Sequence, residues 1–457
     1  MIVSFSVANF RSFSSEETIS LVASNRLSGS HEDHAVPIPG SEEKVLRTAV
    51  LYGANGAGKS NLFKALRYLR SVALFTRNKG DGTGRQPFRF GEAKNDPSRF
   101  DLQFIANEKL YRYGVEVDDE RIVEEWLYEV EGGRQRRIYE RTTDESGGVS
   151  IDAGAFTGAG EKLTALAIVG GPQNQSFLAT ADATLEASDL GEALEGVLAW
   201  FKNGLICIAP DAAFRSLARL LDKDSGFLSF ASDFLKSAST GVDHLEVRRD
   251  EVSEDELRRL LPETVASKLF QDLAEEDDGA TVARLPGNNE VAVERTGRNT
   301  FNLIGIRAAH ELEPGKAVNL ALADESDGTR RLLNLIPALH HVRTTGGVCF
   351  IDEIDRSLHP ILVKEFLEFF LKSCKSCHRQ VIVTTHESNL LDQELLRRDE
   401  IWFAEKDQTG ATRLYSLADF KVRKDLEIRK GYLQGRFGAV PFLGSLEDLL
   451  ERAGRGE

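Results

Sequence analysis

A glycine-rich run constrains this chain more than any other feature. Residues 53–60 read Gly-Ala-Asn-Gly-Ala-Gly-Lys-Ser, a short apolar run precedes them, and a helix-type pattern follows over residues 61–73. A strand before and a helix after are the setting that the phosphate-binding pattern G-x-x-x-x-G-K-[ST] requires. The glycines let main-chain N–H groups close around phosphate oxygens, and the helix N-terminus adds positive partial charge. The run therefore predicts a nucleoside triphosphate site.

The residues of this loop have separate expected roles. Lys59 would reach the β- and γ-phosphates, and the Ser60 hydroxyl would hold Mg²⁺. ATP and Mg²⁺ are therefore the predicted cofactors. The predicted nucleotide-binding residues here are Gly53, Asn55, Gly56, Gly58, Lys59, Ser60 and Asn61.

Two later apolar runs end in residues suited to hydrolysis. Residues 346–353 read Gly-Gly-Val-Cys-Phe-Ile-Asp-Glu, which is the form of a Walker B strand. Asp352 would hold the Mg²⁺ shell, and Glu353 would orient and deprotonate the attacking water. A further run over residues 380–385 ends at His386, which can contact the γ-phosphate and that water. A single histidine at a strand end is more often structural, but its place after Asp352 favours catalysis.

A possible second phosphate-binding turn precedes the Walker B run. Residues 324–331 read Asp-Glu-Ser-Asp-Gly-Thr-Arg-Arg and open an apolar helix pattern. Ser326 and Gly328 would present a hydroxyl, main-chain N–H groups and a helix dipole to an anion. Taken alone, the turn would be better explained as a plain helix N-cap. In the order phosphate loop, Ser-x-Gly turn, acidic strand and histidine, it indicates two half-sites.

Together these segments resemble ABC-type ATPases of the AAA15/AAA21 group, which are relatives of the RecF and SMC heads and of the ATPase half of OLD-family nucleases. The run Asn-Phe-Arg-Ser-Phe at residues 9–13, the run at 351–360 and the closing run at 431–441 also fit this group. The resemblance implies an α/β fold: an ABC-type P-loop ATPase head with a mixed core sheet, an antiparallel β subdomain and a mainly helical insertion. It also implies a head-to-tail homodimer, or a higher homo-oligomer, in which the signature residues Ser326 and Gly328 reach the nucleotide of the other protomer.

The resemblance assigns roles to three further residues. Arg11 would touch the nucleotide, although a surface charge is an equally good interpretation. Asp355 would belong to the loop that crosses the dimer interface. Gln86 is the candidate for the glutamine that binds the metal, although Gln before Pro is also common in loops.

Composition and charge limit the classes of protein to which this chain can belong. No run approaches the roughly 18 apolar residues of a membrane span, and the first residues lack a signal-peptide pattern, so we expect a cytoplasmic protein without membrane contact. The formal net charge of −15 disfavours a broad nucleic-acid face. Basic clusters at residues 134–137 and 421–424 leave a local contact open. Cys374 and Cys377 are expected at a helix end, and Cys207 and Cys349 in the core.

Along the chain the pattern predicts three segments. Residues 1–154 would form the N-terminal ATPase lobe with the antiparallel β subdomain, residues 155–315 the helical insertion, and residues 316–457 the C-terminal lobe. Helix patterns cover 190–202, 227–237 and 254–274, and residues 280–293 read as a hairpin. No apolar heptad pattern persists, and we find no acidic set that would serve a Toprim nuclease.

These observations favour an ATP-binding and hydrolysing ATPase that acts as a dimeric switch or sensor. The resemblance to the ATPase components of AbiL- and PARIS-type systems implies a separate effector, a Toprim-like or RloB-like nuclease, in bacterial anti-phage defence. The alternative is a RecF-like ATP-dependent DNA clamp in recombination or repair. A nucleotide-binding scaffold without turnover is disfavoured by the presence of both Glu353 and His386.

Overall fold

The chain divides into two compact units. The computed structural model describes residues 1–154, 156, 160–212, 214, 217–275, 280–285, 289–313, 316–373, 378–421 and 428–439. The first unit comprises Met1–Ala209, Thr345–Ile354 and Phe366–Glu457, and the second comprises Pro210–Thr344 and Asp355–Glu365. These units do not coincide with the three segments expected from chain order, and that three-part division stays a prediction.

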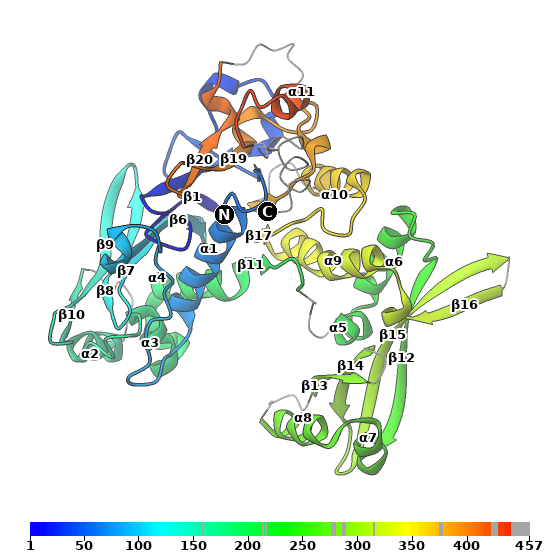
Figure 1. Ribbon diagram of the computed structural model, residues 1–457. Helices are drawn as coiled ribbons and strands as arrows, with labels where there is room; N and C mark the ends of the chain where they lie inside the picture. Colours follow the sequence, from blue (N-terminus) through cyan, green and yellow to red (C-terminus); the bar gives the residue numbers. More distant parts are fainter. Residues whose placement is uncertain are drawn as a thin grey trace, which may run out of the picture. The chain divides into compact units, whose positions relative to one another are not determined.

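A mostly parallel sheet lies at the centre of the first unit (Figure 1). Its first five strands pair in parallel with one another, and the sixth pairs antiparallel with the fifth. The strands Leu205–Ile208 and Gly347–Ile351 are apolar along their whole length, and Thr48–Tyr52 is buried at every position, as expected for parallel strands covered on both faces. The order across the sheet is β11 (Leu205–Ile208), β17 (Gly347–Ile351), β18 (Arg379–Thr384), β5 (Thr48–Tyr52), β19 (Ile401–Lys406) and β20 (Thr412–Ser416).

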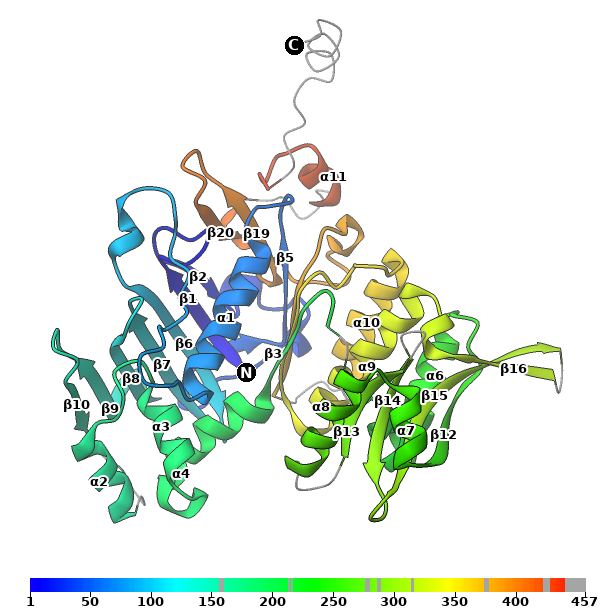
Figure 2. The ribbon, with the colours of Figure 1, turned by 60° about the horizontal axis from the view of Figure 1, so that its bottom comes forward.

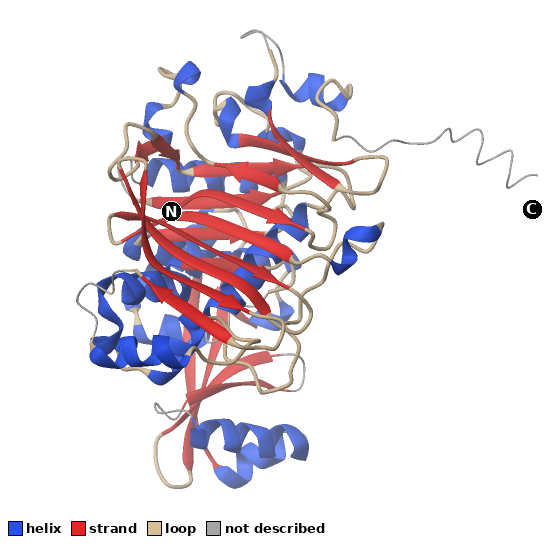
Figure 3. Cartoon of the chain, turned by 90° about the vertical axis from the view of Figure 1, so that its left-hand side faces the viewer, coloured by secondary structure: helices blue, strands red, loops and turns tan. Residues whose placement is uncertain are grey.

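An antiparallel sheet forms the second layer of this unit, and Figure 3 shows its strands running side by side. Apolar and polar side chains alternate in the runs at residues 99–105, 110–117, 122–130 and 137–141, and this period of two predicts strands that bury one face of a sheet. The strands β6 to β9 lie at these places. A hydrophobic cluster joins the two sheets through residues such as Leu51, Phe100 and Phe350. The order is β10 (Val149–Ala153), β9 (Arg134–Thr143), β8 (Ile122–Glu131), β7 (Lys109–Val117), β6 (Ser98–Ala106), β1 (Ile2–Ala8) and β2 (Glu17–Ser20).

Helices of the first unit pack into the same cluster. Residues 155–209, expected to belong to the insertion, contribute Leu163, Phe177 and Phe201 to this core. These helices are α1 (Lys59–Leu74), α2 (Glu161–Val169), α3 (Phe177–Thr184) and α4 (Ala187–Ala199), followed by the π-helical turn Trp200–Gly204. The shorter strands β3 (Ala35–Pro37) and β4 (Lys44–Leu46) pair with one another, and α11 (Ile428–Leu433) lies near the end of the described chain.

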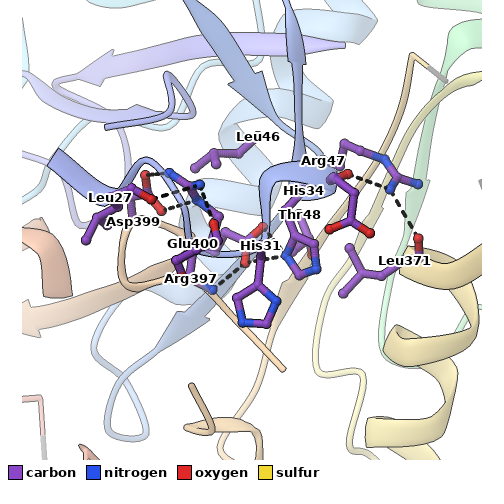
Figure 4. A network of polar contacts seen from close by, with 12 residues as sticks. Leu27, His31, His34, Leu46, Arg47, Thr48, Leu371, Arg397, Asp399 and Glu400 are labelled. Carbon is purple, nitrogen blue, oxygen red and sulfur yellow. Dashed lines mark hydrogen bonds and ion pairs between the residues drawn. The ribbon is translucent and has the colours of Figure 1, made fainter. Parts of the chain in front are cut away.

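A buried polar network fastens residues 24–47 to the start of β19 (Figure 4). The Nδ1 atom of His34 lies 3.0 Å from each carboxylate oxygen of Glu400, whose side chain is fully buried. Arg397 donates two hydrogen bonds, of 2.9 and 2.8 Å, to Asp399. Arg47 donates to the carbonyl oxygens of Asp33 and Leu371 at 3.0 and 3.1 Å. Partnered in this way, the charges can lie inside the protein beside β5.

The second unit contains a sheet of which the sequence predicts only the hairpin at residues 280–293 (Figure 2). The expectation of a mainly helical insertion holds for residues 155–237 but not for the strands that follow. The acidic stretch at residues 250–278 predicts a solvated helical face. Residues 250–253 lie instead on a long strand that pairs with another over ten positions, from His244–Ala309 to Ser253–Thr300. The strands are β12 (His244–Ser253), β13 (Ala280–Leu285), β14 (Asn289–Arg295), β15 (Thr300–Glu313) and β16 (Lys316–Ala321).

Helices cover part of this sheet. The helix predicted over 254–274 is two helices, because Pro262 lacks an N–H donor and disfavours helical geometry at Leu261. Their apolar side chains, including Leu257 and Leu269, form a cluster with Val293 and Phe301 of the sheet. The hairpin predicted over 280–293 is β13 and β14. The helices are α5 (Leu217–Lys223), α6 (Ser225–Ser237), α7 (Glu254–Leu260), α8 (Glu263–Glu275) and α9 (Asp327–Thr345), and α10 (Pro360–Ser373) begins in this unit.

The predicted cysteine environments are partly described. Cys349 is buried in β17, as predicted. Cys207 is half-buried in β11, and burial raises the pKa of its thiol to about 12. Cys374 and Cys377 lie outside the described residues, as do 422–424 of the second basic cluster and 440–441 of the closing run.

Candidate functional site

The predicted catalytic segments meet at one edge of the parallel sheet. The strands β17, β18 and β5 are neighbours, and a predicted site residue lies within two residues of the end of each. Asp352 follows β17, His386 lies two residues after β18, and Gly53 follows β5. Because the carboxyl ends of parallel strands share one edge, the three loops converge there, which is the usual place for a ligand in an open α/β sheet.

The phosphate-binding loop has the compact form that its glycines predict. Lys59, which begins α1, donates from Nζ to the carbonyl oxygens of Gly53 and Ala54 at 2.7 and 3.2 Å. The same Nζ lies 3.4 Å from Nδ1 of His386. The predicted phosphate-binding lysine and the predicted histidine are therefore neighbours. Both lie where a γ-phosphate would be held next to the end of β18.

Ser60 and Asp352 form the pair that could hold Mg²⁺. The Ser60 hydroxyl donates to Oδ1 of Asp352 at 3.2 Å, and the carboxylate is almost fully buried. Mg²⁺ in nucleotide sites takes one or two protein oxygens and completes its shell with phosphate oxygens and water. One hydroxyl and one carboxylate at the end of the phosphate loop therefore fit the group that the sequence predicts.

Glu353 is held in an unusual main-chain conformation. Its φ of +48° lies in the left-handed region, which costs a residue other than glycine roughly 1–2 kcal/mol. The Glu353 N–H donates to Oγ1 of Thr384 at 2.8 Å, and the Thr384 hydroxyl donates to Oδ1 of Asp352 at 2.6 Å. Thr384 therefore orients both acidic residues. Such local strain is typical of functional sites, where the surroundings over-determine it.

Thr384 was missed by the sequence analysis, as were two other hydroxyl residues. Ser12 accepts a hydrogen bond of 2.8 Å from Nδ2 of the predicted site residue Asn61. Thr412 on β20 lies 2.7 Å from Ser12 through their hydroxyl oxygens. The only available signals were the place of Ser12 inside the run at 9–13 and of Thr384 just before His386.

Arg11 lies beside this loop with an environment suited to an anion. Its φ is +52°, and its N–H donates to the carbonyl oxygen of Gln86 at 2.7 Å. Burial, and the charge of Arg89 in second place, lower the pKa of the Arg11 guanidinium. Among the described residues, no partner accepts a hydrogen bond from its buried Nε atom. An anion near these two arginines would relieve both penalties.

Gln86 itself is exposed, and the contact that the structure gives it uses its main-chain oxygen. That contact places the residue next to Arg11 and gives no support to a metal-binding side chain. The role of Gln86 as a metal ligand stays a prediction.

The signature residues lie in the second unit, at the start of α9. The Ser326 hydroxyl accepts from the Thr329 N–H at 3.1 Å and lies 2.9 Å from the Thr329 hydroxyl, so it caps the helix. A Cβ atom on Gly328 would come within 2.9 Å of the carbonyl oxygen of Ser357. The loop that starts at Asp355 therefore packs closely on the signature turn, and Asp355 and Gly328 belong to one local structure.

The structure thus brings together Lys59, Ser60, Asp352, Glu353 and His386 within the first unit. Ser326, Gly328 and Asp355 belong to the second unit, and their action on a nucleotide stays a prediction. None of the helices in the described part of the chain combines the length and the apolar character needed to span a bilayer.

Comparisons with known proteins place the chain in a family. Solved structures that match include an SMC head domain from Thermotoga maritima, with 13% identity, a TM-score of 0.38 and coverage of 91% of this chain and 98% of that one. An Smc head bound to the C-terminal domain of ScpA, from Pyrococcus furiosus, matches with 13% identity and a TM-score of 0.36, covering 91% and 96%. Both scores are low, and the assignment of the chain does not depend on them. No curated protein gives a significant match.

The family model described as "AAA domain, putative AbiEii toxin, Type IV TA system" matches residues 49–392. This range contains the phosphate loop, the signature turn, both acidic residues and His386. The predicted ABC-type P-loop ATPase of the AAA21 group and its α/β fold are confirmed. Because the match covers most of its length, the chain belongs to this family of AAA-domain proteins.

Proposed function

We propose that this protein binds and hydrolyses ATP. The observation that carries the proposal is the hydrogen-bonded set in which Ser60 and Thr384 hold Asp352 while Thr384 fixes the main chain of Glu353. Lys59 and the main-chain N–H groups of the loop would bind the phosphates. A structure that only bound phosphate would have no need of a second acid beside the metal ligand.

Each residue has a separate role in the proposed reaction. Ser60 and Asp352 would hold Mg²⁺, which neutralises charge on the phosphate oxygens when it is bound. Glu353 would accept the proton of the attacking water. His386, whose Nδ1 lies 3.4 Å from Nζ of Lys59, would contact the γ-phosphate and keep that water in line.

The proposed active form is a head-to-tail homodimer. The capped turn at Ser326, with the Ser357 carbonyl packed on Gly328, has the main-chain N–H groups and helix dipole that favour an anion. In the proposed dimer, this turn of one protomer would bind the γ-phosphate held by Lys59 of the other. ATP binding would then close the dimer, and hydrolysis would open it.

The proposed output is the control of a separate effector in bacterial anti-phage defence. Support comes from the resemblance of the motifs to the ATPase components of AbiL- and PARIS-type systems. The printed description of the family, which names a putative AbiEii toxin and a toxin–antitoxin system, points in the same direction. The effector would be a Toprim-like or RloB-like nuclease, released or activated when the ATPase changes state.

Comparing cells with the native operon to cells that carry Lys59→Ala tests the biological role. Loss of the lysine removes phosphate binding without changing the protein surface, so a defence ATPase would lose protection against at least one phage. Equal susceptibility of both strains to every phage in a broad panel would overturn the defence role. Phosphate release by the purified protein tests ATP hydrolysis independently of the role in defence.

The partner is identified by purifying Glu353→Gln protein from its host in the presence of ATP. This variant should keep ATP bound and hold the closed state. A nuclease recovered in stoichiometric amount supports the effector proposal. Recovery of DNA together with replication or repair proteins, and no effector, would instead support the RecF-like clamp.

A further inference from the structure

The β19–β20 hairpin contacts both ends of the phosphate-binding loop. A Cβ atom on Gly53 would come within 2.4 Å of the carbonyl oxygen of Ala404 on β19. At the other end, a Cβ atom on Gly58 would lie 2.1 Å from Oγ1 of Thr412 on β20, and the φ of Gly58 is +112°. The loop main chain therefore packs directly on this hairpin, with no room for a side chain between them at either glycine.

Thr412 also takes part in a closed hydrogen-bond relay with the loop. Asn61 Nδ2 lies 2.8 Å from Ser12 Oγ, Ser12 Oγ lies 2.7 Å from Thr412 Oγ1, and Thr412 Oγ1 lies 2.8 Å from the Ala57 carbonyl oxygen. The amide of Asn61 can only donate in this geometry, and the carbonyl of Ala57 can only accept. The Thr412 hydroxyl lies within donating distance of both the Ser12 hydroxyl oxygen and the Ala57 carbonyl oxygen, and it shares its single proton between them.

The relay fixes the loop where the phosphates would bind. It starts on Asn61 in the first turn of α1 and ends on Ala57, so it holds the part of the loop that contains Gly58 and Lys59. The Thr412 N–H also donates to the Ser12 carbonyl oxygen at 2.7 Å, which joins the two supporting segments to one another. Thr412 is only 1% exposed, so water cannot replace its hydroxyl at little cost.

The segment 428–439 packs on the other side chains of the same hairpin. The rings of Phe403 and Tyr432 stack with centroids 5.7 Å apart, and the rings of Phe403 and Phe437 stack at 6.1 Å. The Tyr415 hydroxyl donates to the Phe437 carbonyl oxygen at 2.8 Å. Between the buried Tyr432 and Phe437, the side chain of Leu433 is 57% exposed. The segment is therefore anchored to the strands that hold the loop, and it presents a surface that another molecule could reach.

We propose that Thr412 is a positioning residue for the phosphate-binding loop and that it couples nucleotide affinity to the packing of segment 428–439. This inference rests on the proposed ATP binding. Neither Thr412 nor the segment belongs to the residues proposed to contact the nucleotide. Thr412 acts through Ala57 and Gly58, and the segment acts through Tyr415 and the hairpin. A partner that moved the exposed part of the segment would change the affinity for ATP.

The first test compares Thr412→Val with Thr412→Ser by titration of a fluorescent ATP analogue. Valine keeps the shape and breaks the relay, leaving the Ala57 carbonyl without its donor, so we expect about tenfold weaker binding. ATP hydrolysis by Thr412→Val should show a raised KM with little change in kcat. In this variant the phosphate-binding loop would lose its order only in the free protein, since bound nucleotide would hold it in place. Serine keeps the hydroxyl and should bind within about twofold of the native protein.

Thr143→Val is the matched control. Thr143 is also a buried strand threonine, and its hydroxyl donates to the Ile122 carbonyl oxygen at 2.6 Å in the antiparallel sheet. The Thr143→Val substitution should lower the melting temperature of the protein and leave its nucleotide affinity unchanged. Equal loss of affinity in Thr412→Val and Thr143→Val, or native affinity in Thr412→Val, overturns the positioning role. If Thr412→Val does not fold, Ser12→Ala breaks the same relay and is judged by the same criteria.

The coupling is tested with Tyr415→Phe, which removes the hydroxyl that donates to the Phe437 carbonyl oxygen at 2.8 Å and that also lies 3.1 Å from Oε2 of Glu405. We expect it to weaken nucleotide binding in the native background and to have no further effect in Thr412→Val. Additive effects of the two substitutions, or no effect of Tyr415→Phe alone, overturn the coupling. If the native protein and Lys59→Ala both fail to bind the analogue, the proposed ATP binding fails as well. Native binding with an unaffected Thr412→Val overturns this inference alone.

Discussion

Thr384 lies where the two acidic residues of the site meet the end of β18. Its hydroxyl donates to Asp352 and accepts from the main chain of Glu353, so one side chain sets the positions of the predicted metal ligand and the predicted base. The motif residues were predictable from the sequence because their types and order are specific. Ser12, Thr384 and Thr412 were not, because a threonine or serine in a strand or loop carries no pattern that reveals its partners.

Thr384→Val should lower the rate of ATP hydrolysis by about tenfold or more, because it removes a buried hydrogen bond to each acid. Thr384→Ser should keep most of the rate. Phosphate release at saturating ATP measures the effect. Thr48→Val is the control, since the Thr48 hydroxyl donates to the Val381 carbonyl oxygen at 2.9 Å between β5 and β18, away from the two acidic residues. A native rate in Thr384→Val would contradict the orienting role.

Glu353→Gln should bind ATP normally and lose about 10²- to 10⁴-fold in turnover, because the amide cannot accept the proton of the attacking water. Single-turnover hydrolysis and nucleotide binding, measured on the same preparation, separate the two effects. Undiminished hydrolysis would remove Glu353 as the base, and loss of binding would assign it a structural role instead.

At the scale of elements, the sequence predicts a strand or helix whose own apolar pattern shows which side is buried. It does not predict a strand that is stabilised mainly by pairing with another strand. The alternating strands β6 to β9 and the helix α1 after the phosphate loop follow from their own sequence periods. The strand β12 does not, because its charged side chains resemble a solvated helix and its stability comes from pairing with β15. The break between α7 and α8 could have been predicted from Pro262 alone.

Glu125 is a buried acid that joins two of these elements. Its carboxylate accepts from the N–H groups of Phe177 and Leu178 at the start of α3 and from the hydroxyls of Tyr113 and Tyr139. Burial raises the pKa of Glu125 above its ordinary value of 4.5, and the charge of Arg141 opposes this shift. The folded protein therefore keeps this proton to a higher pH than the unfolded chain does.

The pH dependence of stability follows from that shift. A raised folded pKa contributes stability that is fully present below pH 4.5 and is lost as the pH rises through the folded pKa. The unfolding free energy of the native protein, relative to Glu125→Gln, should therefore fall as the pH rises above 4.5. Urea unfolding at stepped pH values measures it, with Glu131→Gln at the exposed end of the same strand as the control. A flat or rising difference would contradict the sign.

At the scale of the whole molecule, the two units divide the work that the proposed function requires. The first unit holds the phosphate loop, the predicted metal ligands and the predicted base, and the second holds the signature turn and the loop at Asp355. The sequence order of the motifs predicted both sets of residues. It could not predict how one protomer meets another, because the interface would depend on side chains that follow no motif.

The ATP-dependent dimer gives a direct prediction at this scale. Glu353→Gln protein with ATP and Mg²⁺ should have twice the mass of the same protein without nucleotide, as measured by light scattering after gel filtration. Adding Ser326→Arg should keep ATP binding and abolish the dimer, because the larger side chain blocks the turn that would reach the other protomer's γ-phosphate. A dimer that forms equally with both proteins would exclude the signature turn from the interface.

In the proposed dimer, each nucleotide site is built from residues of two protomers. Mixing two inactive variants shows whether the site is shared in this way. Lys59→Ala lacks the phosphate-binding lysine and Ser326→Arg lacks a usable signature turn, so neither should hydrolyse ATP alone. In a mixed dimer, the lysine of one protomer and the signature turn of the other rebuild one complete site. We therefore expect the mixture to regain part of the native phosphate release. If the mixture stays as inactive as its components, the shared site is contradicted.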